Sequence, residues 1–87
     1  MKIKTLSNLQ LKILKYLYTH SNSGNNIGFK VSKEIFATYS SCCINYKVLK
    51  NKGLIYLENV DGRSKRLFLT DKGIEIIMLY LKIEDLL

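Results

Sequence analysis

Apolar side chains recur along this chain with a helical period in some stretches and with a strand period in others. The first helical pattern follows Ser7 and Asn8, residue types that cap helices, and it runs to about His20. Its apolar positions are Leu9, Ile13, Leu14, Leu17 and Tyr18. Residues 21–28 are rich in turn formers, so they predict a loop, in which Ile27 can pair with the later strands.

Two further helical patterns follow in close succession. The first predicts a helix over about residues 31–37, and the short link at 38–40 predicts a helix-turn-helix with the next helix, residues 40–53. Gly53 ends this third helix, because glycine accepts the left-handed conformation common at helix C-termini. Its buried face is expected to consist of Cys42, Tyr46 and Leu49, spaced i, i+4 and i+7. The residues expected on the opposite face are Ser41, Cys43, Ile44, Asn45 and Lys47.

A strand pattern covers residues 54–60 and 65–69, which are rich in branched and aromatic side chains. Asp61-Gly62 lies between the two runs and is a strong signal for a short hairpin turn. The sequence therefore predicts a two-stranded antiparallel ribbon.

The last helix is expected from Ile74 to about Leu86, after an N-cap at Thr70, and it is apolar nearly all round. One small domain covers only one side of such a helix, so a partner chain is expected to cover the rest. If Ile74, Ile77 and Leu81 pack on the domain, a second apolar stripe is left for that partner. This stripe consists of Ile76, Leu79, Tyr80 and Ile83.

Composition and charge narrow the class of protein. With 87 residues and 47% apolar content, the chain is expected to form a single domain around one core. Its 14 Lys and Arg side chains against 7 acidic ones give a formal charge of +7, and six lysines lie in residues 1–33 with no acid among them. Such a basic body predicts an anionic partner, nucleic acid rather than a membrane. The sequence shows no membrane-spanning run and no signal-peptide pattern, so we expect a cytoplasmic protein.

Two segments resemble a known family of proteins. Residues 40–55, SSCCINYKVLKNKGLI, resemble the recognition helix of winged-helix regulators of the ArsR and MarR kind. Leu69-Thr70-Asp71-Lys72-Gly73 resembles the Leu-Thr-Glu-Lys-Gly that leaves the wing in MarR and PadR relatives, and the likeness as a whole spans about residues 6 to 80. It implies one winged helix-turn-helix domain, mainly α with a small β-wing (α+β), in the order helix-helix-helix-strand-strand-helix. Within residues 1–87 the parts are a basic lead at 1–5, the recognition helix at 40–53, the wing at 54–69 and a C-terminal dimerisation helix at 73–87.

The resemblance implies a transcription regulator that binds double-stranded DNA with sequence specificity. The apolar C-terminal helix predicts a homodimer, and we expect no cofactor. The recognition helix would enter the major groove, and the wing would contact the flanking backbone or the minor groove. Asp61-Gly62-Arg63 resembles the Asp-x-Arg of MarR wings, whose arginine enters the minor groove. The expected DNA-binding residues are Lys30, Lys33, Ser40, Ser41, Cys43, Ile44, Asn45, Lys47, Arg63, Lys65 and Arg66. The expected residues of the homodimer interface are Ile76, Leu79, Tyr80 and Ile83.

A second hypothesis comes from another class of function. A winged-helix module can bind protein or RNA, and here it would dock through the apolar C-terminal helix. Positive charge gathered on the recognition helix and the wing tip favours duplex DNA, whereas dispersed charge favours this alternative.

Other chemistry has little support in the sequence. His20 is the single histidine and is expected at the surface or as a helix cap, and no carboxylate pair, nucleophile triad or phosphate-binding loop is present, so we do not expect an enzyme. Neighbours on a helix point about 100° apart, so Cys42 and Cys43 are poorly placed to hold one metal ion together. We expect Cys42 in the core and Cys43 at the surface, with redox sensing as the alternative. The sequence shows no small-molecule site, and its Lys-, Ile- and Asn-rich, proline-free composition is typical of viral or plasmid-encoded regulators.

Overall fold

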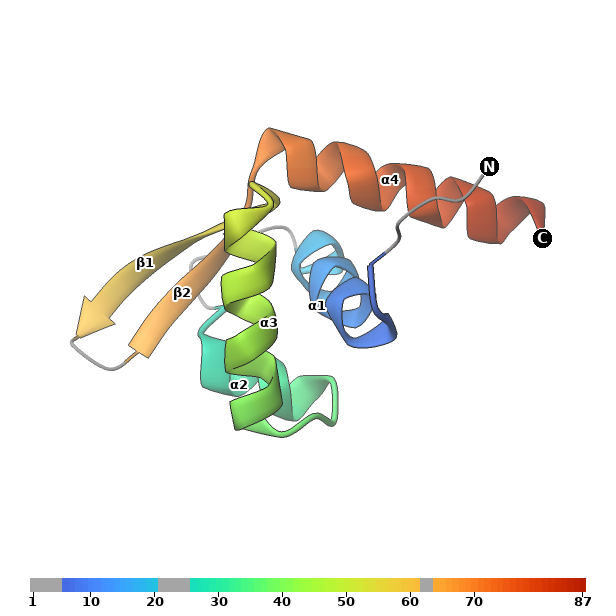
Figure 1. Cartoon of the computed structure of the whole chain (residues 1–87). Helices are drawn as coiled ribbons and strands as arrows, with labels where there is room; N and C mark the ends of the chain where they lie inside the picture. The colour runs from blue at the N-terminus through green and yellow to red at the C-terminus, as the bar shows by residue number, and fades with distance from the viewer. Residues whose placement is uncertain (1–5, 21–25, 62–63) are drawn as a thin grey trace.

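Four helices and one β-hairpin make up residues 6–20, 26–61 and 64–87, the part of the chain that this computed structural model describes (Figure 1). In chain order they are α1 (Asn8–Thr19), α2 (Gly28–Glu34), α3 (Tyr39–Asn51), β1 (Ile55–Asp61), β2 (Ser64–Leu69) and α4 (Asp71–Leu86). This order and the mainly helical α+β class confirm the predicted architecture. Within the described residues, no helix is long and apolar enough to cross a membrane.

Both ends of α1 are capped by side chains. Ser7 Oγ accepts a hydrogen bond from the Gln10 backbone N–H, and Gln10 Oε1 accepts one from the Ser7 N–H, each at 3.2 Å. This reciprocal arrangement satisfies two backbone donors that the helix itself leaves unpaired. At the other end, His20 Nδ1 lies 2.8 Å from the Tyr16 carbonyl oxygen, and the two rings stack with centroids 3.8 Å apart. The predicted capping role of His20 is therefore confirmed.

The prediction for α2 is wrong by about three residues at each end. The helix begins at Gly28 instead of residue 31, because the Val31 N–H already donates to the Ile27 carbonyl oxygen at 2.9 Å. It ends at Glu34, and Phe36 then adopts a left-handed conformation with φ 58°. Ser32 lies inside the helix and is buried.

The helix-turn-helix prediction is confirmed, with α3 starting one residue early at Tyr39. Thr38 caps α3, since its hydroxyl oxygen accepts a hydrogen bond from the Ser41 N–H at 3.4 Å. At the C-terminal end of α3, Gly53 adopts the predicted left-handed conformation, with φ 76°. The predicted buried face is also confirmed, because Cys42, Tyr46 and Leu49 are each at most 5% exposed.

The hairpin pairs β1 with β2 antiparallel, with Ile55 opposite Leu69 and Leu57 opposite Leu67. Ile27 forms an isolated antiparallel bridge to Arg66, and the neighbouring Leu67 N–H donates to the Asn26 carbonyl oxygen at 2.8 Å. This confirms the expectation that Ile27 pairs with the strands. Of the predicted turn, Gly62 lies outside the described residues.

The hairpin returns to the body of the protein at a tight junction with α4. Thr70 Oγ1 accepts from the Gly73 N–H at 3.0 Å and donates to the Gly53 carbonyl oxygen at 2.6 Å, so one hydroxyl joins the end of α3 to the start of α4. The predicted cap is confirmed, although α4 begins at Asp71, three residues before the predicted Ile74. A Cβ atom at Gly73 would overlap the Leu54 carbonyl oxygen, so this junction requires glycine.

One apolar core joins all these elements. It includes the inner face of α1, the buried face of α3, both strands and Ile77 of α4. The hairpin and α4 extend from it on opposite sides, and the described chain is elongated, about 42 Å in its longest dimension (Figure 1). This arrangement leaves the outer face of α3 open to solvent beside the hairpin.

Candidate nucleic-acid interface

The outer face of α3 carries one continuous exposed row of side chains. Ser40, Ile44, Lys47 and Asn51, spaced i, i+4, i+7 and i+11, are all exposed and lie opposite the buried face. Ile44 has 65% of its surface in contact with solvent, which is unusual for a large aliphatic side chain. The row thus presents a hydroxyl, an aliphatic group, an ammonium and an amide along one line.

A hollow of about 260 Å³ separates α3 from the hairpin. Its lining includes Lys47 of α3 and Lys65 of β2, so two positive side chains from distant parts of the sequence share one surface. The other lining residues are Gly28, Tyr39, Cys43, Tyr46 and Leu57. Two cations at a concave surface concentrate positive potential there, which favours an anionic ligand.

The two cysteines occupy different environments. Cys42 is fully buried, and burial raises the pKa of its thiol; its expected place in the core is confirmed. Cys43 was expected at the surface but is half-buried on the flank of α3, where its hydrogen bond to Tyr39 raises the pKa of that hydroxyl. Among the described residues no three His, Cys, Asp or Glu side chains lie close enough to hold a metal ion.

Asn45 points from α3 toward α1 and uses both ends of its amide inside the protein. Gln10 Nε2 donates to Asn45 Oδ1 at 2.9 Å, and Asn45 Nδ2 donates to the Ser41 carbonyl oxygen at 2.8 Å. The structure therefore separates Asn45 from the exposed row. The sequence alone could not show this, because Gln10 lies 35 residues away along the chain.

The helix before α3, α2, carries two lysines. Lys30 and Lys33 are both exposed, and Lys33 Nζ lies 5.1 Å from the centroid of the Phe29 ring. Phe29 in turn packs edge-to-face on Tyr39, the first residue of α3, with ring centroids 5.3 Å apart. Aromatic packing thus holds the Lys33 ammonium near the exposed first turn of α3, where Ser40 and Ser41 lie.

The cations predicted on the wing lie on different faces of the hairpin. Lys65 belongs to the face that carries Leu57 and Leu67 and adjoins α3. Arg66 belongs to the opposite face, where its Nη1 is 3.2 Å from Oε1 of Glu58 on the paired strand. Arg63 lies outside the described residues.

The predicted dimer stripe on α4 divides into two pairs. Leu79 and Ile83 are exposed, at 55% and 49%, as expected for an uncovered face. Ile76 and Tyr80 are instead half-buried against the core, and the Tyr80 hydroxyl accepts a hydrogen bond from the Leu6 N–H at 3.4 Å. The predicted stripe also left out Leu86, which is 79% exposed and, seven residues after Leu79, lies on the same face of α4 as Leu79 and Ile83.

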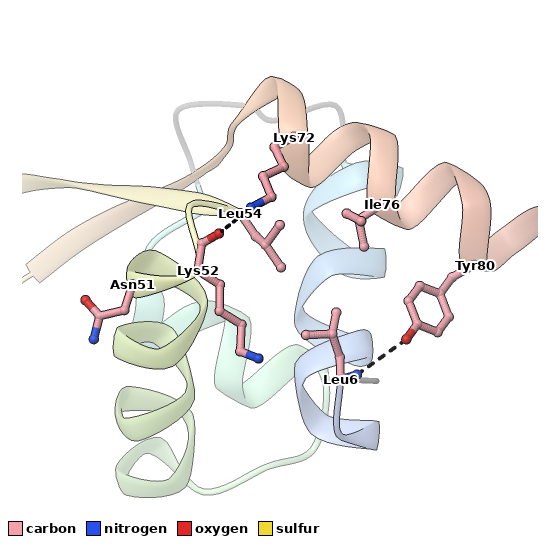
Figure 2. A pocket seen from close by; sticks show the side chains of 7 residues that line it. All are labelled: Leu6, Asn51, Lys52, Leu54, Lys72, Ile76 and Tyr80. Carbon is pink, nitrogen blue, oxygen red and sulfur yellow. Dashed lines mark hydrogen bonds between the residues drawn. The ribbon is translucent and has the colours of Figure 1, made fainter. Parts of the chain in front are cut away.

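An open pocket of about 510 Å³ lies beside these half-buried residues, between the C-terminal end of α3, the residue Leu6 before α1, and residues 72–80 of α4 (Figure 2). Lys72 Nζ donates to the Lys52 carbonyl oxygen at 3.2 Å at one side of it, and Tyr80 meets Leu6 at the other (Figure 2). The lining residues are Leu6, Asn51, Lys52, Leu54, Lys72, Ile76 and Tyr80. The sequence did not predict this pocket, because its lining residues come from three segments that lie far apart along the chain.

Taken with the fold, the exposed row on α3 beside a β-hairpin defines a winged helix-turn-helix domain of the kind found in transcription regulators. Solved structures of this class match the chain closely. MepR, a transcription regulator of the Staphylococcus aureus multidrug efflux pump MepA, superposes with a TM-score of 0.82 and 29% identity. The match covers 92% of this chain and 58% of MepR, so the chain spans less than two thirds of that protein.

Two further structures give the same result. S. aureus MepR in complex with DNA matches at a TM-score of 0.82 and 30% identity, over 92% of this chain and 58% of that one. AF1382 from Archaeoglobus fulgidus matches at 0.80 and 26% identity, over 93% of this chain and 89% of AF1382. No protein-family model and no curated protein sequence matches the chain. The predicted resemblance to winged-helix transcription regulators is confirmed.

Proposed function

We propose that the chain is a transcription regulator that binds double-stranded DNA with α3 in the major groove. The observation that supports this proposal is the exposed row on α3, because the opposite face of the same helix is buried in the core. An α-helix fits the major groove, and a helix anchored on one side presents the other side to base edges. The likeness to MepR, which has been solved in complex with DNA, supports the same reading.

Direct base contacts are assigned to Ile44 and Lys47. An exposed aliphatic side chain can contact the methyl group of thymine, and a lysine can donate to the acceptor atoms of guanine. Ser41, in the exposed first turn, and Cys43, on the side of the hollow, flank this pair. Asn45 was expected to contact a base, but its amide is already engaged by Gln10 and Ser41, so we assign it to the support of α3.

Phosphate contacts are assigned to the side chains around the row. Ser40 is the first member of the row, and aromatic packing holds Lys33 of α2 near it. Lys30 is exposed on the same helix as Lys33, and Lys65 lies across the hollow. Such contacts fix the orientation of the protein on the duplex without reading its sequence. Arg66 is the weakest of the assigned cations, since its pair with Glu58 must loosen before the guanidinium reaches a phosphate. Arg63 remains a candidate for the minor groove on the sequence alone.

We further propose that the regulator is a homodimer held by the exposed face of α4. Exposed rows of large apolar side chains on a small protein usually mark an interface, and a twofold dimer is the commonest way to cover the same row on two copies. Two copies of α3 related by such an axis can read half-sites about 34 Å apart. The proposal needs no cofactor, small-molecule ligand or catalytic step.

The experiment compares binding of a labelled random-sequence duplex with binding of single-stranded RNA of equal length in a gel shift. We expect a shift of the duplex at lower protein concentration than of the RNA. The Lys47→Ala variant should weaken the duplex shift, and the matched variant Lys12→Ala, an exposed lysine on α1, should not. Preferential binding of RNA, or of neither nucleic acid, would favour the alternative of an RNA- or protein-binding module that docks through α4.

A further inference from the structure

The exposed face of α4 has a spacing typical of paired helices. Ile76, Leu79, Ile83 and Leu86 are separated by three, four and three residues, the alternation that keeps apolar side chains on one seam between two helices. We call these four residues the α4 seam. Three of the four are exposed, and Ile76 is half-buried where the seam meets the pocket of Figure 2.

The α4 seam is complementary to itself when two copies run in opposite directions. With the twofold axis at Leu79, this residue meets Leu79 of the second copy. Ile76, three residues before the axis, then meets Ile83 of the second copy, which lies four residues after it. One residue of difference is about 1.5 Å along a helix, which side chains absorb.

The charges beside the α4 seam select this antiparallel direction. Glu75 and Lys82 are exposed, and each lies one residue before a member of the seam; Lys72 is also exposed and, seven residues before Leu79, lies in line with the seam. In the antiparallel pair Glu75 lies beside Lys82 of the second copy, and symmetry repeats this pair. In a parallel pair Lys72 would meet Lys72 of the second copy on the seam, and this like-charge contact would oppose pairing.

The pocket lies where the end of the second helix would arrive. Leu86 is seven residues after Leu79, and Lys72 is seven residues before it, so Leu86 of the second copy comes level with Lys72. There the apolar side chains of Leu54, Ile76 and Tyr80 line the pocket (Figure 2). Leu86, which is 79% exposed in the single chain, thereby gains an apolar contact surface.

We infer that α4 pairs antiparallel with α4 of a second copy, in a register centred on Leu79, and that Leu86 of that copy covers the pocket beside Tyr80. This inference rests on the dimer of the proposed function and adds its direction, its register and the occupant of the pocket.

Disulfide cross-linking tests the register. In a Cys43→Ser background, which leaves only the buried Cys42, the Leu79→Cys variant should cross-link with itself under mild oxidation. Mixed Ile76→Cys and Ile83→Cys chains should also cross-link, and so should mixed Lys72→Cys and Leu86→Cys chains. Ile83→Cys alone should not, because its two copies would be about 12 Å apart along the helix axis, beyond the reach of a disulfide. Lys30→Cys on α2 is the matched control and should remain uncross-linked.

Charge reversal gives a second readout that does not depend on new cysteines. Glu75→Lys and Lys82→Glu should each weaken the dimer, by about fivefold in dissociation constant, and the double variant should restore it. Leu86→Ala should also weaken the dimer, whereas Met78→Ala, which is exposed but off the seam, should not.

The outcomes separate this inference from the proposed function. Cross-linking of Ile83→Cys with itself, or none in any variant, overturns the antiparallel pair, even if the parent binds duplex DNA normally. The predicted set of cross-links supports the pair, even if the same protein fails to bind duplex DNA and the proposed function is lost.

Discussion

Ile44 and Asn45 are neighbours on α3, yet their side chains face different surroundings. Ile44 projects into solvent, whereas the amide of Asn45 is held by Gln10 and the Ser41 carbonyl oxygen. A sequence pattern places both on the polar side of the helix, because helical period alone cannot show which side another helix covers. The hydrogen bonds of Asn45 show that its side chain faces α1, so Ile44 is expected to act in DNA recognition and Asn45 in the support of α3.

Ile44→Ala should weaken binding to a selected DNA sequence more than binding to a random duplex, by about 1 kcal/mol, because it removes contact with base edges only. Its stability should change little, since the side chain is 65% exposed. Fluorescence anisotropy with both duplexes and thermal melting of the variant measure the two effects. Equal losses on both duplexes would remove Ile44 from sequence recognition.

Tyr46→Phe should lower the free energy of unfolding by about 1 kcal/mol. The buried hydroxyl of Tyr46 donates to the Gly28 carbonyl oxygen at 2.7 Å, and this bond joins α3 to the start of α2. Urea unfolding measures the loss. Tyr56→Phe, at an exposed ring on the outer face of the hairpin, is the matched control and should be close to neutral.

Alkaline pH should destabilise the protein through the same buried cluster. Burial is the main cause that raises the pKa of both the Cys42 thiol and the Tyr46 hydroxyl above their ordinary values of 9.0 and 10.0. A group with a raised folded pKa keeps its proton where the unfolded chain has lost it, so stability is fully present below about pH 9 and falls as the pH rises further. Urea unfolding between pH 7 and pH 10.5 measures this. The decline should be shallower in Tyr46→Phe, and an identical decline would exclude Tyr46 as a cause.

At the scale of elements, sequence predicted best where a single residue determines the local conformation. Gly53 was predicted to end α3 and Thr70 to cap α4, and both are confirmed, although α4 starts three residues earlier than predicted. The i, i+4, i+7 spacing identified the buried face of α3. The start of α2 was missed because Gly28 is ordinarily a helix breaker; here it opens the helix, close beside Tyr46, where a Cβ atom would lie 3.1 Å from the Tyr46 ring. Such tertiary contacts leave no local pattern.

The candidate site was predicted to a similar extent. Helical period placed Ile44 and Lys47 on the outer face of α3, and Ser40 was among the expected DNA-binding residues. Asn51 was not predicted, and the predicted Cys43 and Asn45 lie outside the exposed row. The separation of Lys65 from Arg66 follows from strand alternation, but which face adjoins α3 depends on the packing of the whole hairpin. The half-burial of Ile76 and Tyr80 depends on Leu6 and Leu54, which are far away in sequence.

Gly73→Ala should be the most damaging single change at the junction between the hairpin and α4. The added methyl group would overlap the Leu54 carbonyl oxygen, so the backbone must shift, at a cost of about 3 kcal/mol. Gly53→Ala is the matched comparison, because it has open space around it and carries only the cost of a left-handed conformation, about 1 kcal/mol. Chemical unfolding ranks the two variants, and an equal loss would contradict the close approach at Gly73.

At the scale of the whole molecule, recognition and assembly occupy opposite ends. The helix-turn-helix and the hairpin lie at one end, and the exposed half of α4 extends from the other (Figure 1). Lys15 of α1 pairs with Glu84 of α4 at 3.0 Å, so this lysine supports the assembly end and is not part of the proposed DNA surface. A substitution in the recognition end should therefore leave dimerisation unchanged, and a substitution in the exposed half of α4 should leave the recognition surface folded.

Replacing both Leu79 and Ile83 with glutamate should give a folded monomer that binds half-sites weakly. The two side chains are exposed in the single chain, so the domain loses little stability, but four charges at the twofold axis oppose pairing. Sedimentation equilibrium and circular dichroism measure assembly and folding. A parent protein that sediments as a monomer at micromolar concentration would contradict the dimer.

The salt dependence of duplex binding tests the central proposal most directly. If α3, α2 and the hairpin neutralise about five phosphates for each subunit, the affinity should fall with salt at a log–log slope of about −4 to −5 per subunit. Lys47→Ala should lose about 1 kcal/mol, with a shallower slope if this lysine contacts phosphate, while Lys12→Ala should match the parent. Anisotropy titrations of a labelled duplex at several salt concentrations supply both values. Binding that does not depend on salt, or equal affinities of Lys47→Ala and the parent, would contradict the proposed placement of α3 on DNA.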